Sequence, residues 1–358
     1  MIQGHGGNVV ELAEELGCRP EDITDMSSNI NPLGALPGLI EYLQERMDRI
    51  TSLPEVDAQG AVRAVAALLG VSEQRVLAGN GTTQFIYTAC AVLKSRRVLI
   101  VGPTYADYAD GARLHGIMPE FFLTSPNLDF AVDVVRLSAR LTGIDTVFLC
   151  NPNNPTGRLI PHAQLMELCT QHREVRFIID ESYLSFARED QGMCQCALDN
   201  VIVLWSASKI FGIPGLRVGF LVADPSVIEP FHRYMQPWCV NSLAQEAVRY
   251  IGAHPDTVNA FIDQTRAHLD AESALFRQRL AAAPLIVYPS TTSYLLIGLP
   301  EGQTAGTVCR ALAEQRFLIR NCANFYGLDE GYIRIALKDA AANTAVARHL
   351  VALVHSQR

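Results

Sequence analysis

The stretch Ser206-Ala-Ser-Lys-Ile-Phe-Gly-Ile-Pro-Gly-Leu-Arg217 lies between two strand-like apolar runs, Val201–Trp205 and Val218–Val222. It places a lysine among small residues, beside glycines and a proline, where the backbone turns tightly and a bound group can approach closely. A lysine with a nearby hydroxyl and a fixed cation suits a cofactor that carries a phosphate and a carbonyl group. Pyridoxal phosphate (PLP) is such a cofactor, and we predict that Lys209 forms a Schiff base with it. The alternative is a loop lysine without a function.

The composition is that of a globular protein. The 358 residues are 49% hydrophobic and 18% charged, which is enough for one large and one smaller domain. The net charge of −8 argues against nucleic acid or an anionic membrane as a partner, so individual arginines would have to bind an anionic substrate. The nine cysteines have no zinc-ligand spacing, which predicts reduced thiols and no metal. Without a signal peptide or a membrane-spanning run, we expect a cytoplasmic protein.

Short β-rich runs alternate with helical patterns through the middle of the chain. The predicted strands are 97–101, 146–150, 175–180, 201–205 and 218–222, and the predicted helices include 39–47, 60–69, 85–93, 106–115 and 162–172. This alternation predicts an α/β domain with a mostly parallel sheet. Functional groups of such sheets lie beyond the carboxyl ends of the strands, which is where Asn151–Gly157, Asp180–Tyr183 and Ser206–Lys209 fall.

The last third of the chain has a different pattern, which predicts a smaller α+β domain. We expect helices at 242–251, 257–283, 305–315 and 340–355 and strands at 286–288, 294–297, 318–320 and 332–337. The chain then has three parts. These are an N-terminal arm at 1–45 that joins the small domain, a large PLP-binding domain at 46–245 and a small C-terminal domain at 246–358.

Several residues at these positions fit the parts of PLP. Asp180 can keep the pyridine nitrogen protonated, Asn154 and Tyr183 can donate to the ring hydroxyl, and Tyr105 can stack on the ring. A glycine-rich turn that opens a helix offers free N–H groups to an anion. We expect the cofactor phosphate to be held by Gly81, Thr82, Ser206 and Arg217. Taken singly, Asp180 could be a helix cap or an ion-pair partner, and the tyrosines could be rim residues.

Three motifs in this order resemble those of a known family. They are Asn151-Pro-Asn-Asn-Pro-Thr-Gly157, Asp180-Glu-Ser-Tyr183, and Ser206-Ala-Ser-Lys209 followed by Gly215-Leu-Arg217-Val-Gly219. The chain is thereby similar to the fold-type I PLP-dependent transferases, and more narrowly to the histidinol-phosphate aminotransferase group. The resemblance covers nearly the whole chain. It implies a homodimer whose sites are completed across a two-fold interface.

Four further segments resemble the threonine-phosphate decarboxylases of cobalamin biosynthesis, which make aminopropanol phosphate. They are His5-Gly-Gly-Asn8, Ser28-Asn29-Ile-Asn31-Pro-Leu-Gly34, Met235-Gln-Pro-Trp238 and Ile319-Arg320-Asn-Cys322-Ala-Asn324. This resemblance implies a set of substrate ligands. The phosphate end would be held by His5, Gly6, Asn29 and Arg320, and the α-carboxylate by Arg334, with Asn154 also at the substrate. The chemistry agrees, because a guanidinium binds phosphate or carboxylate through two hydrogen bonds.

We therefore predict a lyase that decarboxylates L-threonine O-3-phosphate to (R)-1-aminopropan-2-ol O-phosphate, with Lys209, Asp180 and Tyr183 as catalytic residues. Decarboxylation and transamination share the cofactor ligands, and the bond at Cα that stands perpendicular to the ring is the one that breaks. A histidinol-phosphate-type aminotransferase is therefore an alternative. Two others are an L-serine O-phosphate decarboxylase and a non-catalytic PLP-binding regulator.

Two positions depart from the pattern of the family. Leu53, before Pro54, stands where the group usually has a tyrosine that reaches the neighbouring subunit's cofactor phosphate. Thr82 stands where the decarboxylases commonly have glutamate. Neither residue takes part in the reaction directly, but both bear on the identity of the substrate. Phosphoserine lacks one methyl group of phosphothreonine, and a methyl group discriminates by only about 1–3 kcal/mol.

Overall fold

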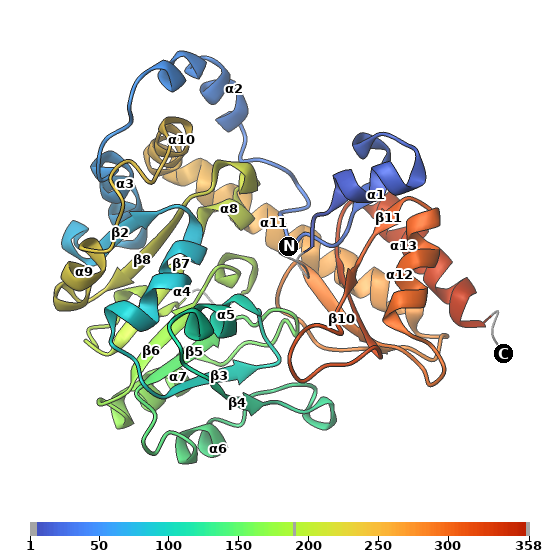
Figure 1. The fold of residues 1–358 in the computed structure, drawn as a ribbon. Coiled ribbons are helices and arrows are strands. Elements are labelled where there is room, and N and C mark those ends of the chain that lie inside the picture. Colours follow the sequence, from blue (N-terminus) through green and yellow to red (C-terminus); the bar gives the residue numbers. More distant parts are fainter. Residues whose placement is uncertain (1–5, 189–190, 356–358) are drawn as a thin grey trace.

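A seven-stranded sheet, which we call the large sheet, forms the centre of the larger part of the molecule (Figure 1). The computed structural model describes residues 6–188 and 191–355. The order of the strands is β2-β8-β7-β6-β5-β3-β4. Their bounds are β2 Val76–Gly79, β3 Val98–Gly102, β4 Glu120–Leu123, β5 Thr146–Cys150, β6 Arg176–Asp180, β7 Val201–Trp205 and β8 Gly219–Ala223. Strand β8 runs in the opposite direction to the other strands of this sheet, and the remaining neighbouring pairs are parallel. The predicted mostly parallel sheet is therefore confirmed.

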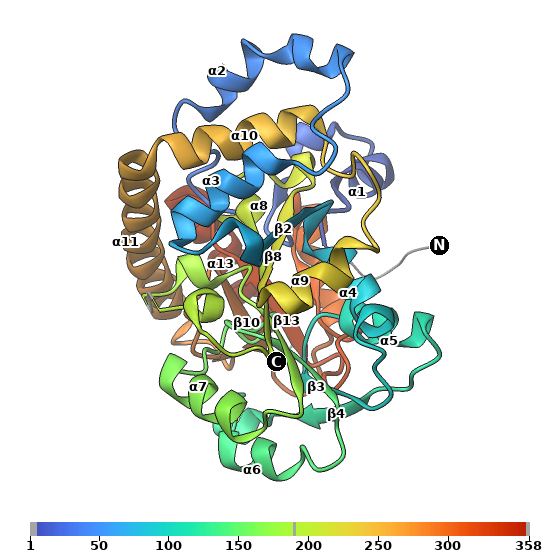
Figure 2. The ribbon, with the colours of Figure 1, turned by 90° about the vertical axis from the view of Figure 1, so that its left-hand side faces the viewer.

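Helices cover the large sheet on both sides, with α7 on one side and α4 and α5 on the other (Figure 2). The helices in this part are α2 Leu39–Gln44, α3 Gln59–Leu69, α4 Gly81–Val92, α5 Asp107–Leu114, α6 Val134–Ala139, α7 His162–Gln171, α8 Ala207–Ile210, α9 Pro225–His232 and α10 Ser242–Ala253. All residues of β3, β5, β7 and β8 are buried. Continuous apolar strands such as Val201–Trp205 are what a doubly covered sheet requires.

A smaller antiparallel sheet lies in the C-terminal part, in the order β12-β13-β10-β9. Its strands are β9 Ile286–Val287, β10 Tyr294–Gly298, β12 Arg320–Asn321 and β13 Tyr332–Ala336, and its helices are α11 Pro255–Leu280, α12 Ala305–Glu314 and α13 Ala340–His355. The long helix α11 packs against α13. None of the helices in the described ranges has the length and hydropathy needed to cross a membrane.

The N-terminal segment contacts this C-terminal part. Strand β1, Thr24–Asp25, pairs in parallel with β11, Phe317–Leu318, and the Met26 carbonyl accepts a hydrogen bond from the Ala336 N–H at 2.8 Å. Helix α1 spans Val9–Leu16. Short 3-10 helices lie at Pro20–Asp22, Met47–Thr51, Glu73–Arg75, Pro126–Leu128, Leu184–Phe186, Met193–Gln195 and Pro214–Leu216. The three-part division at 1–45, 46–245 and 246–358 stays a prediction.

Several elements differ from the sequence-based prediction. Strands β2 and β4 and helices α6 and α9 were not predicted, and β4 shows why: it is an edge strand with no buried residue, so its sequence has no clear apolar alternation. The single strand predicted at 318–320 is wrong, because β11 and β12 belong to two different sheets. Leu318 pairs with β1, whereas Arg320 pairs with Arg334 of β13, and a local pattern cannot show that change of partner.

The turn that carries Lys209 docks against the N-terminal segment. The Lys209 carbonyl accepts a hydrogen bond from the Asn31 N–H at 3.1 Å, and the Phe211 carbonyl accepts one from the Leu36 N–H at 3.2 Å. Gly212 has φ +66°, and a Cβ there would lie 2.2 Å from the Gly34 carbonyl oxygen. The turn therefore needs glycine at 212 both for its conformation and for the space.

Replacing Gly212 with alanine should destabilise the protein by about 2 kcal/mol more than replacing Gly34 with alanine. Both residues have positive φ, +66° and +84°, but a Cβ at 34 meets nothing within 4 Å. The Gly34→Ala variant thus controls for backbone strain alone, and the difference measures the collision with the neighbouring segment. Urea unfolding of the two variants provides the comparison, and equal midpoints would contradict the expectation.

Candidate active site

A cavity of about 280 Å³ lies at the carboxyl ends of β5, β6 and β7, where their following loops meet. Among its lining residues are Gly6, Asn29, Gly81, Thr82, Tyr105, Asn154, Asp180, Tyr183, Ser206, Lys209, Arg217, Arg320 and Arg334. These are all the described residues that the sequence suggested for the site. The remaining one, His5, lies outside the described residues.

The register of the parallel strands brings these loops together. Cys150 at the end of β5 pairs with Asp180 at the end of β6, and Asp180 pairs with Leu204 in β7. Because the three strands end at nearly the same level, residues far apart in the sequence emerge at one edge of the sheet. Asn154, Tyr183 and Ser206 follow these ends by only a few residues.

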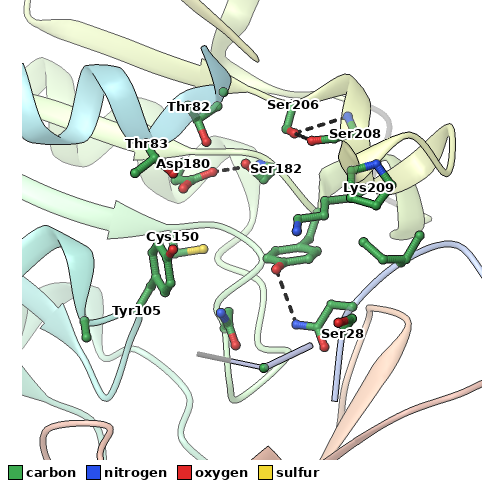
Figure 3. Close-up of a pocket in the computed structure, with 18 of the residues that line it drawn as sticks. Ser28, Thr82, Thr83, Tyr105, Cys150, Asp180, Ser182, Ser206, Ser208 and Lys209 are labelled. Atoms are coloured by element: carbon green, nitrogen blue, oxygen red, sulfur yellow. Dashed lines mark hydrogen bonds between the residues drawn. The ribbon is translucent and has the colours of Figure 1, made fainter. Parts of the chain in front are cut away.

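Lys209 extends from the short helix α8 into the cavity, toward the space that Tyr105 and Asp180 also border (Figure 3). The helix is capped by the Ser206 hydroxyl, which accepts a hydrogen bond from the Ser208 N–H at 3.3 Å. Burial, followed by the charges of Arg217 and Arg334, lowers the pKa of Lys209 to about 8 against the opposing effect of Asp180. About a tenth of this amine is therefore uncharged at pH 7, far more than for an ordinary lysine, and the uncharged form is the nucleophile.

Asp180 is a buried carboxyl group with several donors. The Tyr108 hydroxyl donates to Oδ2 at 2.8 Å, and the Ser182 N–H donates to Oδ1 at 3.0 Å (Figure 3 shows the second bond). Burial raises the pKa of Asp180, whereas the hydrogen bonds from Ser182 and Tyr108 and the charge of Lys209 lower it. These donors stabilise the ionised form, which a pyridinium nitrogen requires as its partner.

An anion cradle forms where helix α4 begins. A Cβ on Gly81, the first residue of α4, would lie 2.6 Å from Nη2 of Arg217, so the guanidinium reaches directly over the helix N-terminus. A Cβ on Gly219 would lie 2.4 Å from the Thr82 nitrogen, so this side also needs glycine. The hydroxyls of Ser206 and Ser208, 2.7 Å apart, line the same cavity. Free N–H groups, hydroxyls and a guanidinium together fit a phosphate.

Two further arginines come from the C-terminal sheet. Arg334 is only 4% exposed and donates hydrogen bonds to Asn154 Oδ1 and to the Ser27 carbonyl oxygen, while its Nε has no partner among the described residues. Arg320 donates to Asn324 Oδ1 at 2.6 Å. Burial and the neighbouring Arg334 lower the pKa of Arg320 to about 10. A bound anion stabilises two like charges that lie side by side, here the buried Arg334 and the half-buried Arg320.

Asn29 and Tyr183 connect the N-terminal segment to the loop after β6. The Asn29 amide Nδ2 donates to the Tyr183 hydroxyl at 3.3 Å, and the buried Asn29 Oδ1 has no partner among the described residues. Burial raises the pKa of Tyr183 to about 12. Its hydroxyl is therefore protonated at neutral pH and can donate to an oxygen in the cavity.

Sequence reasoning missed several cavity residues. Five of them form hydrogen bonds with the expected site residues: Ser27, Tyr108, Ser182, Ser208 and Asn324. Tyr108 could have been found, because it lies in the first turn of α5, only three residues after Tyr105, and the two rings pack edge to face with centroids 5.8 Å apart. Ser27 could not, because its contact to Arg334 uses a backbone carbonyl, which no side-chain pattern reveals.

The fold and this cavity define a PLP-dependent enzyme of fold-type I. Residues 21–353 match the family described as aminotransferase class I and II, and the chain belongs to this family. The expected fold class and the expected cofactor are thus confirmed, since PLP is the cofactor of these enzymes. The donor set fits PLP: an amine with a lowered pKa, a buried carboxylate and a phosphate cradle lie in one cavity.

Known proteins similar to this chain include decarboxylases and aminotransferases. A threonine-phosphate decarboxylase of Salmonella typhimurium (strain LT2) is 35% identical over 346 residues, which cover 95% of this chain and 93% of that one. A histidinol-phosphate aminotransferase of Methanocaldococcus jannaschii is 29% identical over 93% of this chain and 89% of its own. The crystal structure of L-threonine-O-3-phosphate decarboxylase from Porphyromonas gingivalis has a TM-score of 0.83 and 29% identity, over 92% and 99% of the two chains. The resemblance inferred from the motifs is confirmed.

The lowered pKa of Lys209 predicts how the cofactor-free protein takes up PLP. The uncharged amine fraction grows with pH, so the uptake rate should rise through a midpoint of about 8 instead of the ordinary lysine pKa of 10.5. Stopped-flow absorbance provides the measurement. The Lys209→Ala variant is the control and should lack the spectral change of a covalent link. A midpoint in the ordinary lysine range would contradict the electrostatic environment described above.

Proposed function

We propose that this protein is a PLP-dependent decarboxylase that converts L-threonine O-3-phosphate to (R)-1-aminopropan-2-ol O-phosphate for cobalamin biosynthesis. The observation that carries the proposal is a pair of cations in the cavity, Arg320 and Arg334, in addition to Arg217 at the phosphate cradle. Both Arg217 and Arg334 lower the pKa of Lys209, so the amine lies within electrostatic range of the cradle and of this pair.

A substrate with two anionic groups suits this pair. Phosphothreonine carries a phosphate and an α-carboxylate, one for each of Arg320 and Arg334, whereas histidinol phosphate carries only the phosphate. The similarity to the Salmonella decarboxylase supports the same substrate. The aminotransferase remains the second candidate, because the carboxylates of an oxo-acid acceptor could also bind these arginines and because the Methanocaldococcus aminotransferase is similar as well.

The residues of the chain can perform the steps that such a reaction needs. When bound, PLP supplies an electron sink for a bond that breaks at the substrate Cα. Asp180 holds a proton at the pyridine nitrogen by its negative charge. Tyr183, kept protonated and contacted by Asn29, donates a hydrogen bond toward the ring oxygen. Arg334, itself fixed by Asn154 and Ser27, orients the carboxylate, and Lys209 delivers a proton to Cα.

Product analysis with three substrates tests this proposal. The PLP-loaded protein should release carbon dioxide from phosphothreonine without an oxo-acid acceptor and without forming a 2-oxo acid. Phosphoserine and histidinol phosphate, assayed in parallel, show whether the methyl group and the carboxylate are required. Turnover that depends strictly on an oxo-acid acceptor would overturn the decarboxylase in favour of the aminotransferase. If the PLP-loaded protein turns over none of the three substrates, with or without an acceptor, both enzymes are overturned in favour of a PLP-binding regulator. Turnover that survives in the Lys209→Ala variant would overturn the catalytic role of Lys209.

We further propose that the protein is a cytoplasmic homodimer. All nine cysteines are free, as expected in a reducing compartment. Apolar side chains are exposed in the segment around Leu53, and we call the following residues the 47–56 patch: Met47, Ile50, Leu53 and Val56, with exposed fractions of 48%, 62%, 75% and 54%. Trp238 adjoins the patch, because its backbone N–H donates a hydrogen bond to the Val56 carbonyl at 2.9 Å. A second copy of the chain would bury these side chains.

The Leu53→Asp variant should weaken the dimer, because it places a charge within a surface that association would desolvate. Light scattering across a dilution series should show a shift toward monomer relative to the unaltered protein. Leu114→Asp is the matched control, since Leu114 is 66% exposed but lies at the end of α5, outside the patch. An unaltered protein that is monomeric, or an equal effect of both variants, would contradict the proposed interface.

A further inference from the structure

An aromatic stack joins the edge of the large sheet to the loop after β12. The rings of Phe121 in β4 and Tyr326 in the loop have centroids 4.0 Å apart and planes inclined by 26°. Strand β4 is the last strand of the sheet, next to β3. Tyr326 is 58% exposed, so this contact lies on the surface and is not part of the continuous core.

A close backbone contact lies beside the stack. Gly327 has φ +94°, and a Cβ there would lie 2.8 Å from a methyl carbon of Leu123 in β4. The same methyl carbon of Leu123 would be 3.3 Å from a Cβ on Gly102, the last residue of β3. Leu123 is thus wedged between the strand that leads to Tyr105 and the loop that contains Tyr326. We call Phe121, Leu123, Tyr326 and Gly327 the clasp.

The loop in the clasp carries cavity residues. Arg320, Asn324 and Phe325 all line the cavity, and the Arg320 guanidinium lies 5.1 Å from the centre of the Phe325 ring while it donates to Asn324. Two backbone hydrogen bonds tighten the loop, from the Phe325 N–H to the Cys322 carbonyl at 3.0 Å and from the Leu328 N–H to the Phe325 carbonyl at 2.9 Å. Because these bonds stiffen the loop, its outer contact with β4 can influence where Asn324 and Phe325 hold Arg320.

Electrostatics favours a restraint on the loop that holds Arg320. Arg320 and Arg334 are neighbouring cations on paired strands, and their repulsion favours separation whenever no anion lies between them. Asn324, which is exposed, accepts a hydrogen bond from Arg320 at 2.6 Å, so the position of this loop bears on the position of the guanidinium. The clasp joins this loop to the edge of the large sheet, outside the buried cluster in which Cys322 and Phe325 pack with Phe130.

We propose that the clasp is a positioning element: it holds Arg320 in place for the phosphate end of the substrate. The inference rests on the proposed function in assigning the phosphate to Arg320. Its residues do not touch the reacting atoms, so the clasp should act on substrate binding and leave the chemical step nearly unchanged. Because one aromatic pair contributes a modest free energy, its loss should raise KM for phosphothreonine about three- to tenfold.

The test uses the PLP-loaded enzyme with Phe121→Ala, Tyr326→Ala and the double variant. We expect both single variants to raise KM by similar factors and to change kcat less than about twofold, with an unchanged cofactor spectrum. The double variant should be no worse than either single one, because each removes the same stack. Tyr326→Phe should restore the affinity, and Gly327→Ala should raise KM by crowding Leu123. Leu128→Ala is the control at an exposed apolar residue beyond β4, 54% exposed, and should not change KM.

Calorimetry with inorganic phosphate keeps this test independent of the reaction. Weaker phosphate binding by Tyr326→Ala, compared with the unaltered enzyme and Leu128→Ala, supports the clasp even if phosphothreonine is not decarboxylated. Unchanged KM and phosphate affinity in Tyr326→Ala would overturn the clasp even if decarboxylation is confirmed. Additive effects of Phe121→Ala and Tyr326→Ala would also overturn it, because the two rings would then act separately.

Discussion

The structure depends on holding several cations close together at one edge of a sheet before any anion binds. Lys209 lies within electrostatic range of Arg217 and Arg334, and Arg334 in turn lies beside Arg320. In a partly buried site this repulsion is costly. Two features reduce this repulsion. The pKa of Lys209 is lowered, so part of the amine is uncharged, and carbonyl and amide oxygens accept hydrogen bonds from the guanidinium groups of Arg320 and Arg334.

The parallel sheet provides the rigid part of this arrangement. Strands β5, β6 and β7 end together, which brings side by side Asn154 in the loop after β5, Asp180 at the end of β6 and Lys209 in the helix after β7. The charge of Asp180 raises the pKa of Lys209, and hydrogen bonds from Tyr108 and Ser182 oppose the effect of burial, which raises the pKa of Asp180. The cofactor end of the cavity is thus built on strand ends and on the N-terminus of α4.

The substrate end is assembled differently. Asn29 and the Ser27 carbonyl come from the N-terminal segment, and Arg320 and Arg334 come from β12 and β13. The loop after β12 contacts β4 through the stack of Tyr326 on Phe121. These pieces are far apart in the chain and meet only because β1 pairs with β11 and the small sheet packs beside the large one. A site divided in this way can change its substrate while the cofactor end stays the same.

Many of the secondary-structure elements and most of the site residues could be predicted from the amino-acid sequence. The buried strands Thr146–Cys150 and Val201–Trp205 were predicted at their observed bounds, because continuous apolar runs between turns have few other solutions. The role expected for Lys209 followed from its small neighbours and from Asp180 and Arg217 in the family motifs. All the suggested site residues that the structure describes line one cavity.

Other features depend on contacts that no local pattern contains. The split of 318–320 between two sheets, the carbonyl contact of Ser27 to Arg334 and the stack of Phe121 on Tyr326 each join segments distant in the chain. Lysine as a residue type does not specify a pKa near 8, which arises from burial and from cations that folding brings near. The residues of the chain thus determined which chemistry is available at Ser206–Arg217. The tertiary packing decided the charge state of that lysine and which arginines face it, because both depend on distances through space.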